Sequence, residues 1–527
     1  MATTVALKAP QISTEPQVSL RAWLSVAGVM LGAFMAILDI QITNSSLKDI
    51  QGALNATLEE GSWISTSYLV AEIIVIPLTG WLSKVFSNRL YLLVNTVLFI
   101  FFSVCCASAW DLNSMIVFRG LQGFSGGVLI PMAFTVMLTT LPPSKQTIGL
   151  ALFGMTATLA PSIGPTIGGW LTENFGWEYI FYINVIPGAL MLAALWFTMD
   201  PRPLQLNLLK KGDWWGILTM AIGLGSLQIV LEEGSRKDWF GSDLIARLAV
   251  VAVVFLALFL WIEFTRKEPF INLRLFAKGN FGLGSIVNVT LGLGLYGSVY
   301  ILPLYLAQIQ GYNALQIGQV IMWAGLPQFF IFPLLPRLMK RFDTRVLLLV
   351  GLALFSTSCF MNAGMTHDTG ADQLIWSQIV RALGQPLIIT PLSSLITIGV
   401  GKDAGSASGL FNMMRNLGGS MGIALLATLL DQREKFHSST IGEAVSRYNP
   451  LTEERLDQLT QNFMRHGMDF YTAQNQAMAQ LDRLVRREAT VMAFNDCFFI
   501  IGVGLLLGGL VVLLMKKGTS PGAGAGH

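Results

Sequence analysis

The sequence predicts an all-α membrane protein with fourteen transmembrane helices, arranged as two six-helix bundles plus two inserted helices. Three observations support this: the composition, the regular recurrence of long apolar stretches, and an internal repeat. Of the 527 residues, 53% are hydrophobic and 12% are charged, whereas a soluble domain carries about 25% charged residues. Water would not tolerate so much apolar surface, and a lipid bilayer would.

Apolar stretches of about twenty residues, the length that a helix needs to cross the hydrocarbon core, recur fourteen times. Barrel strands need only about ten residues, so these stretches are expected to be helices. The expected spans are 22–47, 61–82, 90–109, 112–138, 147–171, 179–198, 214–231, 244–262, 280–307, 315–338, 346–365, 374–399, 404–430 and 492–515.

The basic residues predict that both termini are cytoplasmic, because lysine and arginine concentrate in cytoplasmic loops. With that orientation the inner segments hold nineteen of them, and the short outer loops only Lys48, Arg236 and Lys237, with Arg247 at a span edge. The expected organisation is a cytoplasmic tail 1–21, a first bundle 22–200, two inserted helices with their loops 201–278, a second bundle 279–515 and a cytoplasmic tail 516–527.

The two halves of the chain resemble each other. Pro77, Lys84, Phe86 and Arg89 match Pro333, Lys340, Phe342 and Arg345 at a constant offset of 256. Arg119 and Gly164 match Arg381 and Gly422 at similar offsets. Two parallel repeats suit alternating access, because one site at their interface can open to either side of the membrane by rocking.

One outer connection, residues 431–491, is long and polar and has helical periodicity. Two interpretations stay open: a docking surface for a periplasmic partner, or an amphipathic segment lying on the membrane surface.

Five charged residues lie deep inside the expected spans: Asp39, Glu72, Arg119, Arg381 and Arg415. A charge near the bilayer centre costs at least about 2.5 kcal/mol, so each should face protein or water and have a partner. Asp39 and Arg119 both lie about 10–12 Å below the outer boundary, from the rise of 1.5 Å per residue, and are expected to pair. Glu72 lies near the midplane. Arg381 repeats the depth of Arg119, but no acid lies at a matching depth in spans 9–14.

A carboxyl group in a partly dry cavity can take a proton from one side and release it to the other. Our hypothesis is that Asp39 and Glu72 are the proton-coupling acids and that Arg119 tunes them. Which of the two acids is the main carrier is open. The alternative is a static buried ion pair that only fixes helix packing. For Arg381 and Arg415 a structural and a functional role are equally compatible with the sequence.

The fifth expected span contains Gly164, Pro165, Gly168 and Gly169. Glycines let another helix approach closely, and proline frees a backbone carbonyl and bends the axis. The stretch therefore suits a pivot, and ordinary small-residue packing is the alternative.

Several of these motifs resemble those of major facilitator drug–proton antiporters, in particular EmrB-type permeases of the fourteen-helix branch. Arg119, Gln122 and Gly123 fall in a fourth-span motif, Gly164 to Gly169 in the fifth-span antiporter motif, and Leu38 to Asn44 in the first-span motif. Ile180 to Pro187 resembles the start of the sixth span.

The resemblance implies a major facilitator fold in the bacterial inner membrane. It also implies export of hydrophobic or amphipathic toxic compounds against inward proton movement, with the proton gradient as energy source and no cofactor. A periplasmic adaptor of the EmrA type and an outer-membrane channel are implied as partners. Asn44, Arg381 and Arg415 are candidate polar residues of the substrate cavity.

The loop after the second span departs from the family pattern. Lys84 stands where an acid is usual and Ser87 where a glycine is usual, while Gly80 and Arg89 are kept. The cytoplasmic charge latch attributed to that motif is therefore in doubt.

Other classes of function fit the sequence less well. Proton-pumping subunits of respiratory complexes need lysines and histidines inside the membrane, and here these residues fall in loops or tails. The net charge is only +3 and the basic residues are scattered over short loops, so the sequence does not indicate a nucleic-acid partner. No metal site or enzymatic activity is expected. Within transporters, the alternative is a proton-coupled exporter or importer of one metabolite, such as a siderophore, a fatty acid or an amino acid.

Overall fold

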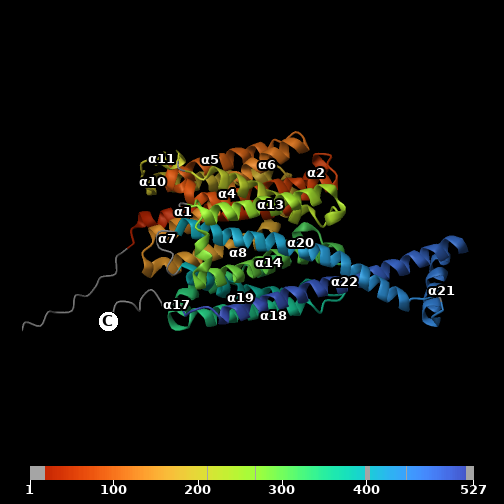
Figure 1. The fold of residues 1–527 in the computed structure, drawn as a ribbon. Coiled ribbons are helices and arrows are strands. Elements are labelled where there is room, and N and C mark those ends of the chain that lie inside the picture. Colours follow the sequence, from red (N-terminus) through yellow and green to blue (C-terminus); the bar gives the residue numbers. More distant parts are fainter. Residues whose placement is uncertain (1–17, 211, 267–268, 398–403, 447, 518–527) are drawn as a thin grey trace, which may run out of the picture.

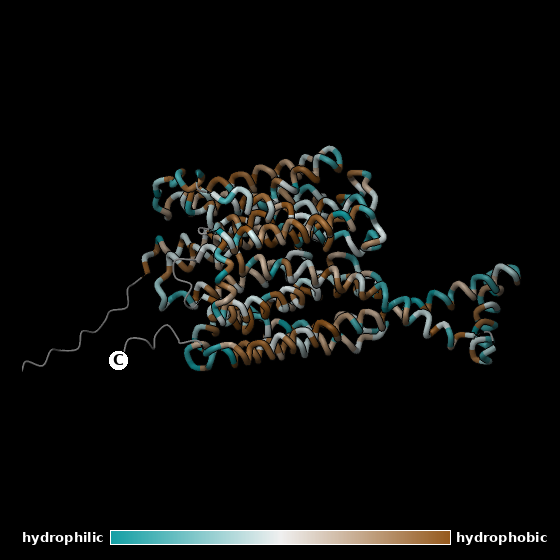
Figure 2. Tube along the Cα trace, viewed as in Figure 1, coloured by the Kyte–Doolittle hydropathy of each residue, from teal (hydrophilic) through white to brown (hydrophobic). Residues whose placement is uncertain are grey.

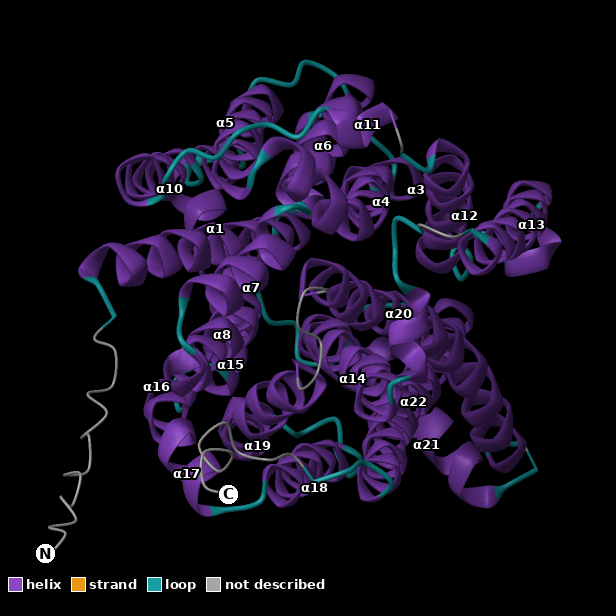
Figure 3. Ribbon diagram, turned by 60° about the vertical axis from the view of Figure 1, so that its left-hand side comes forward, coloured by secondary structure: helices purple, strands orange, loops and turns teal. Residues whose placement is uncertain are grey.

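The computed structural model of the chain describes residues 18–210, 212–266, 269–397, 404–446 and 448–517. Most of the two expected tails, and the basic residues Lys8, Lys211, Lys267 and Lys402, lie outside these ranges. Within them, every regular element is a helix (Figure 3). The predicted all-α class is confirmed.

The described ranges contain fourteen helical segments that are long and apolar enough to span a membrane, in the order that the sequence predicts. The chain is a multi-pass membrane protein. Eight spans are single helices: α1 (Leu20–Ser45), α5 (Asn88–Ala107), α8 (Pro143–Phe175), α12 (Trp214–Glu233), α13 (Asp243–Thr265), α14 (Gly279–Gln308), α18 (Thr344–Asn362) and α19 (Ala371–Thr397). Two long helices, α20 (Ala404–Ala444) and α22 (Phe470–Leu513), continue beyond the bundle.

Three spans consist of two helical pieces each: α3 (Leu58–Gly61) with α4 (Trp63–Phe86), α6 (Leu112–Gly126) with α7 (Leu129–Thr140), and α9 (Tyr179–Tyr182) with α10 (Val185–Thr198). The connecting helices are α2 (Leu47–Ala53), α11 (Asn207–Lys210), η1 (Trp239–Gly241), η2 (Leu273–Ala277) and α21 (Pro450–Arg465).

The remaining span, Ala314–Arg341, is broken into five short helices. These are α15 (Ala314–Ile321), η3 (Met322–Ala324), α16 (Gln328–Ile331), η4 (Phe332–Leu334) and α17 (Leu335–Arg341). Pro327, Pro333 and Pro336 fall within twenty residues of one another, and each removes a backbone donor. In the first half, α4 of the matching span contains only Pro77 and continues through it without a break.

Polar residues begin several spans by capping the first turn, whose N–H groups have no partner within the helix. Side chains of four such residues accept backbone hydrogen bonds of 2.7–3.0 Å: Asp111, Asp213, Asn313 and Asp343. The caps help to fix where each apolar segment becomes helical.

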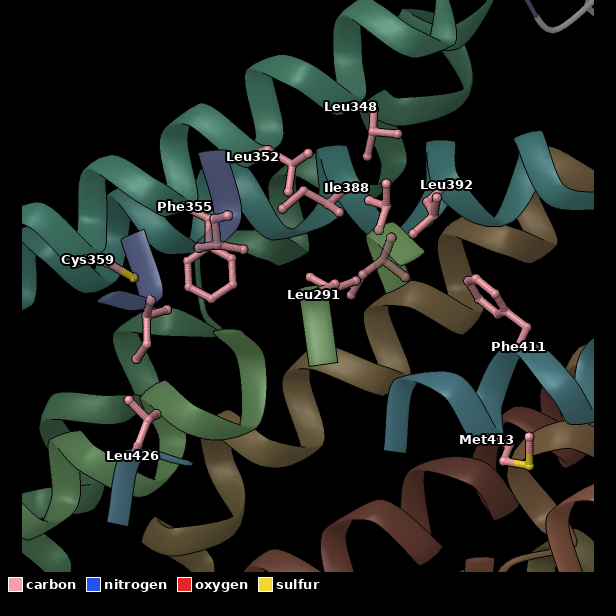
Figure 4. Close-up of a cluster of buried hydrophobic side chains, with 14 of the residues drawn as sticks. Leu291, Leu348, Leu352, Phe355, Cys359, Ile388, Leu392, Phe411, Met413 and Leu426 are labelled. Carbon is pink, nitrogen blue, oxygen red and sulfur yellow. The ribbon is translucent and has the colours of Figure 1, made fainter. Parts of the chain in front are cut away.

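The molecule has one apolar core in each half. The first is built from residues between Val26 and Leu195, and the second mainly from residues between Phe270 and Met515. Figure 4 shows part of the second core, where Leu348, Leu352 and Phe355 of α18 face Ile388 and Leu392 of α19.

The inserted helices lie at one edge of the junction between the halves (Figure 3). α12 packs against α4 of the first half and α20 of the second, whereas α13 packs chiefly on α12. Most of α13 is therefore open to lipid, as its exposed Val253 and Trp261 show.

The predicted polar connection 431–491 is a helical hairpin that projects from one end of the bundle, opposite the end where α1 begins and α22 ends (Figures 1 and 2). α20 has 41 residues and α22 has 44. At 1.5 Å per residue these are about 60 and 66 Å long, twice the hydrocarbon core. The hairpin continues the axes of the two spans, so it does not lie flat across the end of the bundle.

At the base of the hairpin, Asp496 of α22 pairs with Arg433 (2.5 Å) and His437 (2.7 Å) of α20. These contacts join the two helices as they leave the bundle. At the tip, α21 folds back on α22 and buries Leu459, Ala473 and Ala477. The hairpin is thus a packed unit.

Candidate functional site

Asp39 of α1 and Arg119 of α6 form the predicted pair, with Oδ2 and Nη1 2.6 Å apart. Both side chains are buried, at 0% and 1% exposure. Such a pair is tolerated in a dry interior only when further hydrogen bonds satisfy the remaining donors and acceptors.

The further hydrogen bonds are present. Gln122 and Asn184 donate to Oδ1 of Asp39, at 3.0 and 2.6 Å, and Arg119 also donates to Oε1 of Gln122 at 2.7 Å. The guanidinium lies 4.3 Å from the ring centroid of Tyr68. A carboxylate with three donors is well compensated as an anion, and in this conformation neither aqueous compartment reaches it.

Glu72 of α4 lies in a different environment, although it is equally buried at 2% exposure. Its one hydrogen bond that crosses to the other half comes from Nδ2 of Asn416 in α20, at 3.3 Å to Oε1. Among the described residues, no basic side chain comes within ion-pair distance of it. Arg119, expected to act on both acids, therefore bonds directly only to Asp39.

Arg415 lies beside Asn416 at the junction of the two halves. Its Nη2 donates to Oδ1 of Asn412 (2.8 Å), and its guanidinium lies 5.9 Å from the ring centroid of Phe153 in α8. The Nε of Arg415 and the Oδ1 of Asn416 have no hydrogen-bond partner. We refer to Glu72, Asn412, Arg415 and Asn416 as the interface cluster.

Arg381 and Asn44 are not part of this cluster. Arg381 is buried inside the second bundle, where the amide oxygen of Gln385 can accept from its Nε at 2.8 Å and the Phe355 ring lies 5.3 Å away. No acid among the described residues bonds to it, as the sequence predicts. Asn44 is exposed near the end of α1 and accepts from Ser65 at 2.7 Å. The three residues expected to line one cavity therefore lie apart.

The glycines of the fifth span face two different neighbours. A methyl group on Gly164 would come 2.6 Å from Gln41 of α1, and one on Gly168 would come 2.3 Å from Ser45 of the same helix. A methyl group on Gly169 would instead meet Ala314 of α15 at 3.1 Å. Together with Pro165 inside α8, these residues bring α8 close to its own bundle on one side and to the second bundle on the other.

Besides Asp213, which caps α12, two further buried acids escaped the sequence reasoning, Glu233 and Glu263. Glu233 ends α12 at 1% exposure and accepts from Ser62 (3.0 Å) and Thr66 (2.7 Å). Glu263 lies near the end of α13 at 3% exposure. The expected spans stopped at 231 and 262, before these charges. The signal at the first site was Gly234, because helices commonly end at a glycine and none occurs earlier in that turn.

The loop that departs from the family pattern contains a strained residue, and in the described part of the chain neither Lys84 nor Arg89 forms an ion pair with the other half. Ser87 has a φ of 66°, a conformation that favours glycine. Arg89 donates to the carbonyl of Trp196 (2.9 Å) and stacks on its ring, both within the first bundle.

Comparisons with known proteins place the chain in a family. The Major Facilitator Superfamily profile matches residues 29–423. The chain is 36% identical to the colistin resistance protein EmrB of Acinetobacter baumannii, over 94% of this chain and 97% of that protein. It is 32% identical to the multidrug export protein EmrB of Escherichia coli strain K12, over 94% and 96% of the two chains.

The solved structure of the human organic anion transporter MFSD10 (TETRAN) shares the fold, with a TM-score of 0.55 at 14% identity, over 95% of this chain and 100% of that one. The membrane-spanning helices and the two bundles of the structure agree with the family that these relatives indicate. The chain belongs to the Major Facilitator Superfamily and is a membrane transporter of the EmrB type.

Proposed function

We propose that the chain exports hydrophobic or amphipathic toxic compounds across the inner membrane in exchange for protons, with the hairpin on the outer face and both termini in the cytoplasm. The observation that carries this is the position of Glu72, a buried acid whose hydrogen-bond partner Asn416 belongs to the opposite bundle. Gain or loss of a proton there changes the interaction between the two bundles directly.

The contrast between the two acids assigns them different roles. Asp39 has three donors, one of them cationic, so its ionised form is stabilised in place. Glu72 has a neutral amide, so its ionised form is poorly compensated, and protonation removes the cost of a buried charge. We therefore assign Glu72 as the main proton carrier and the Asp39–Arg119 pair as the support that holds α1, α6 and α10 together.

Contacts between the bundles on either side of Glu72 are suited to alternate opening. At the termini end, a methyl group on Gly80 of α4 would lie 2.8 Å from the backbone of Gly405 in α20. At the hairpin end, one on Gly318 of α15 would lie 2.6 Å from the backbone of Thr166 in α8. Such close contacts between small residues separate without leaving large unpaired side chains.

The hairpin supports a further part of the proposal, docking of a periplasmic adaptor that leads to an outer-membrane channel. Its tip carries exposed apolar side chains that the fold does not use: Tyr448, Leu451, Met464, Phe470 and Tyr471. Exposed apolar residues gathered at one end of a projecting element are typical of a protein interaction site.

The test is substrate transport in proteoliposomes under an imposed pH gradient, with a lipophilic dye as substrate. We expect Glu72→Gln to reduce proton-driven transport at least about ten-fold, because the amide cannot exchange a proton. Downhill exchange of the dye should persist. Glu59→Gln, at an exposed acid that starts the same span, is the matched control and should transport like the unmodified protein.

Unchanged proton-driven transport by Glu72→Gln would contradict the assignment of Glu72. Transport by the unmodified protein that ignores the pH gradient would contradict proton coupling itself. Asp39→Asn should behave differently from Glu72→Gln: it leaves Arg119 as a buried unpaired cation, which costs about 3–5 kcal/mol, so the yield of folded protein should fall.

A further inference from the structure

A line of polar side chains runs from Glu72 toward the hairpin end of the bundle, between α12 and α20. Gln228 of α12 donates from Nε2 to Oγ of Ser420 in α20 (2.7 Å) and to Oε1 of Glu232 (3.0 Å). Ser420 lies one helical turn, about 6 Å, beyond Asn416, the hydrogen-bond partner of Glu72. The groups in order are Glu72, Asn416, Ser420, Gln228 and Glu232.

The two adjacent acids at the end of α12 point in different directions, because neighbouring residues on an α-helix are about 100° apart. Glu233 faces α4, where the hydroxyls of Ser62 and Thr66 bond both of its oxygens. Glu232 faces the line on α20 through Gln228. Glu233 therefore joins the inserted helix to the first bundle, and Glu232 is available for another role.

Two acceptors on this line have no protein partner, Oε1 of Gln228 and Oδ1 of Asn416. Gln228 is only 2% exposed. Buried carbonyl oxygens are almost always hydrogen-bonded, to ordered water where no protein donor is near. These two oxygens are therefore places where ordered water can bind along the line of polar groups, which we refer to as the path.

The short loop after α12 lies beyond the outer end of the path. Trp239 donates from its indole to Thr428 (2.9 Å), which lies two turns beyond Ser420 on α20. Asp238 and Trp239 have positive φ values of 57° and 48°. Such strain persists only where surrounding contacts hold it, and the hydrogen bond to Thr428 is one of these contacts.

We propose that Glu232 is a second proton-carrying residue, which takes up protons from the outer side and passes them along this path to Glu72. The inference rests on the proposed proton-coupled function. In the transfer, the Glu232 carboxyl gives up its proton to a water in the path, and the chain of waters delivers one proton to the Glu72 carboxylate. Glu232 is left ionised and Glu72 neutral.

The groups around Glu232 are compatible with this role. Arg236 and Glu233 are its charged neighbours on the same segment. From the packed elements, Tyr300 of α14 lies near it, Ser420 and Asn416 come from α20, and Glu72 on α4 is the acid at the other end of the line. No fixed ion pair between Glu232 and a basic residue occurs in the described part of the chain.

The test is proton-driven transport by Glu232→Gln in proteoliposomes, measured at several values of the pH on the hairpin side. We expect a rate reduced at least about ten-fold and a flattened dependence on that pH, with downhill dye exchange and dye affinity in detergent unchanged. Glu233→Gln is the matched control, because an amide can still bond Ser62 and Thr66, and it should keep the unmodified pH profile. Glu232→Asp keeps the carboxyl group and should keep the pH dependence.

Three results would overturn the inference. One is an unmodified pH profile in Glu232→Gln. Another is equal loss of transport in Glu232→Gln and Glu232→Asp, which would mean that Glu232 only packs. The third is an unmodified protein that shows no pH-driven transport, which would refute the proposed function as well. Loss in Glu72→Gln alone, with Glu232→Gln intact, would refute only the role of Glu232.

Discussion

Asp39 and Glu72 show how two buried acids in one bundle acquire different properties from their partners. Both are at most 2% exposed, and both lie on helices of the first half. Asp39 is surrounded by donors of its own bundle, whereas Glu72 bonds to a residue of the other. The difference matters because only the second arrangement changes when the bundles move relative to each other.

At Ser87 we predict that replacement by glycine stabilises the protein. The residue has φ 66° and ψ 147°, a backbone conformation that is open almost only to glycine. Holding a serine in this conformation costs about 1–3 kcal/mol of stability. The substitution Ser87→Gly removes the long hydrogen bond that the Ser87 hydroxyl accepts from the N–H of Leu90 (3.5 Å), and this loss costs a few tenths of a kcal/mol. The net gain of about 1 kcal/mol should raise the midpoint of thermal unfolding in detergent.

Ser108→Gly is the control, since Ser108 also lies at the end of a helix but has a φ of −107°. It should not raise the midpoint. A lower midpoint for Ser87→Gly than for the unmodified protein would contradict the strain at Ser87.

The sequence predicts the pairing of Asp39 with Arg119 because the rise along a helix gives each charge a depth. Depth does not give the rotation of a helix about its axis, which packing alone sets. For that reason the donors Gln122 and Asn184 could be quoted as motif residues but not placed on Asp39. For the same reason the sequence could not separate Arg415, at the interface, from Arg381, inside a bundle.

At the scale of the element, α8 has two small-residue faces with separate effects. Gly168 faces α1 within the first bundle, and Gly169 faces α15 of the second. The first contact is present whichever way the transporter opens. The second exists only while the hairpin end of this interface is closed.

We predict that Gly168→Ala and Gly169→Ala differ in effect. A methyl group at Gly168 would come within 3.1 Å of the Ile42 backbone, so α1 and α8 must move apart. We expect this to lower the free energy of unfolding by about 1–3 kcal/mol. Gly169→Ala should leave stability nearly unchanged but favour opening at the hairpin end. Unfolding midpoints, and labelling of a cysteine introduced at Leu315, measure the two effects.

Gly504→Ala, where no atom lies within 4 Å of the added methyl group, is the matched control for both variants. Equal midpoints for Gly168→Ala and Gly504→Ala would refute the tight contact with α1. Unchanged labelling in Gly169→Ala would refute a role for Gly169 in closing the interface.

The sequence located every span because hydrophobic length is a local property. It missed the last residues of α12 and α13, because in both cases the helix continues beyond the charged residue at which the apolar run ends. The breaks in the span Ala314–Arg341 were equally hidden. Its repeat partner has a similar pattern but only one proline, and a proline alone does not show whether its helix bends or breaks.

At the scale of the whole molecule, the two bundles and the hairpin are separate units with separate expected roles. We predict that the triple variant Leu451→Ser, Phe470→Ser and Tyr471→Ser keeps proton-driven transport in proteoliposomes. In cells it should lose resistance to toxic compounds, because the altered side chains lie on the tip and not near the bundles. Drug susceptibility of a deletion strain that carries the variant measures the effect.

The control is Phe101→Ser with Val97→Ser, a comparable loss of exposed apolar surface on the lipid-facing side of α5. This control should keep adaptor binding in a pull-down, whereas the tip variant should lose it. Full resistance in the tip variant would contradict docking at the hairpin.

The two-bundle architecture was predictable because the internal repeat is visible in the sequence. The helices of the hairpin were predictable because their apolar residues recur at helical spacing. The direction in which the hairpin projects was not predictable, because an amphipathic helix can lie on a membrane or pack on another helix. The inward-facing pairs Arg433 and His437 with Asp496 decide it, and they involve residues about sixty positions apart.

The unbroken length of α20 has a mechanical consequence. One rod carries Arg415 and Asn416 about a third of the way along its length and the first arm of the hairpin at its end. From Asn416 to Ala444 it measures about 42 Å, so a tilt of ten degrees about Asn416 would sweep its far end through about 7 Å. A charge change of atomic size at Glu72 would thus be amplified, by leverage alone, into a displacement large enough for a neighbouring protein outside the membrane to sense.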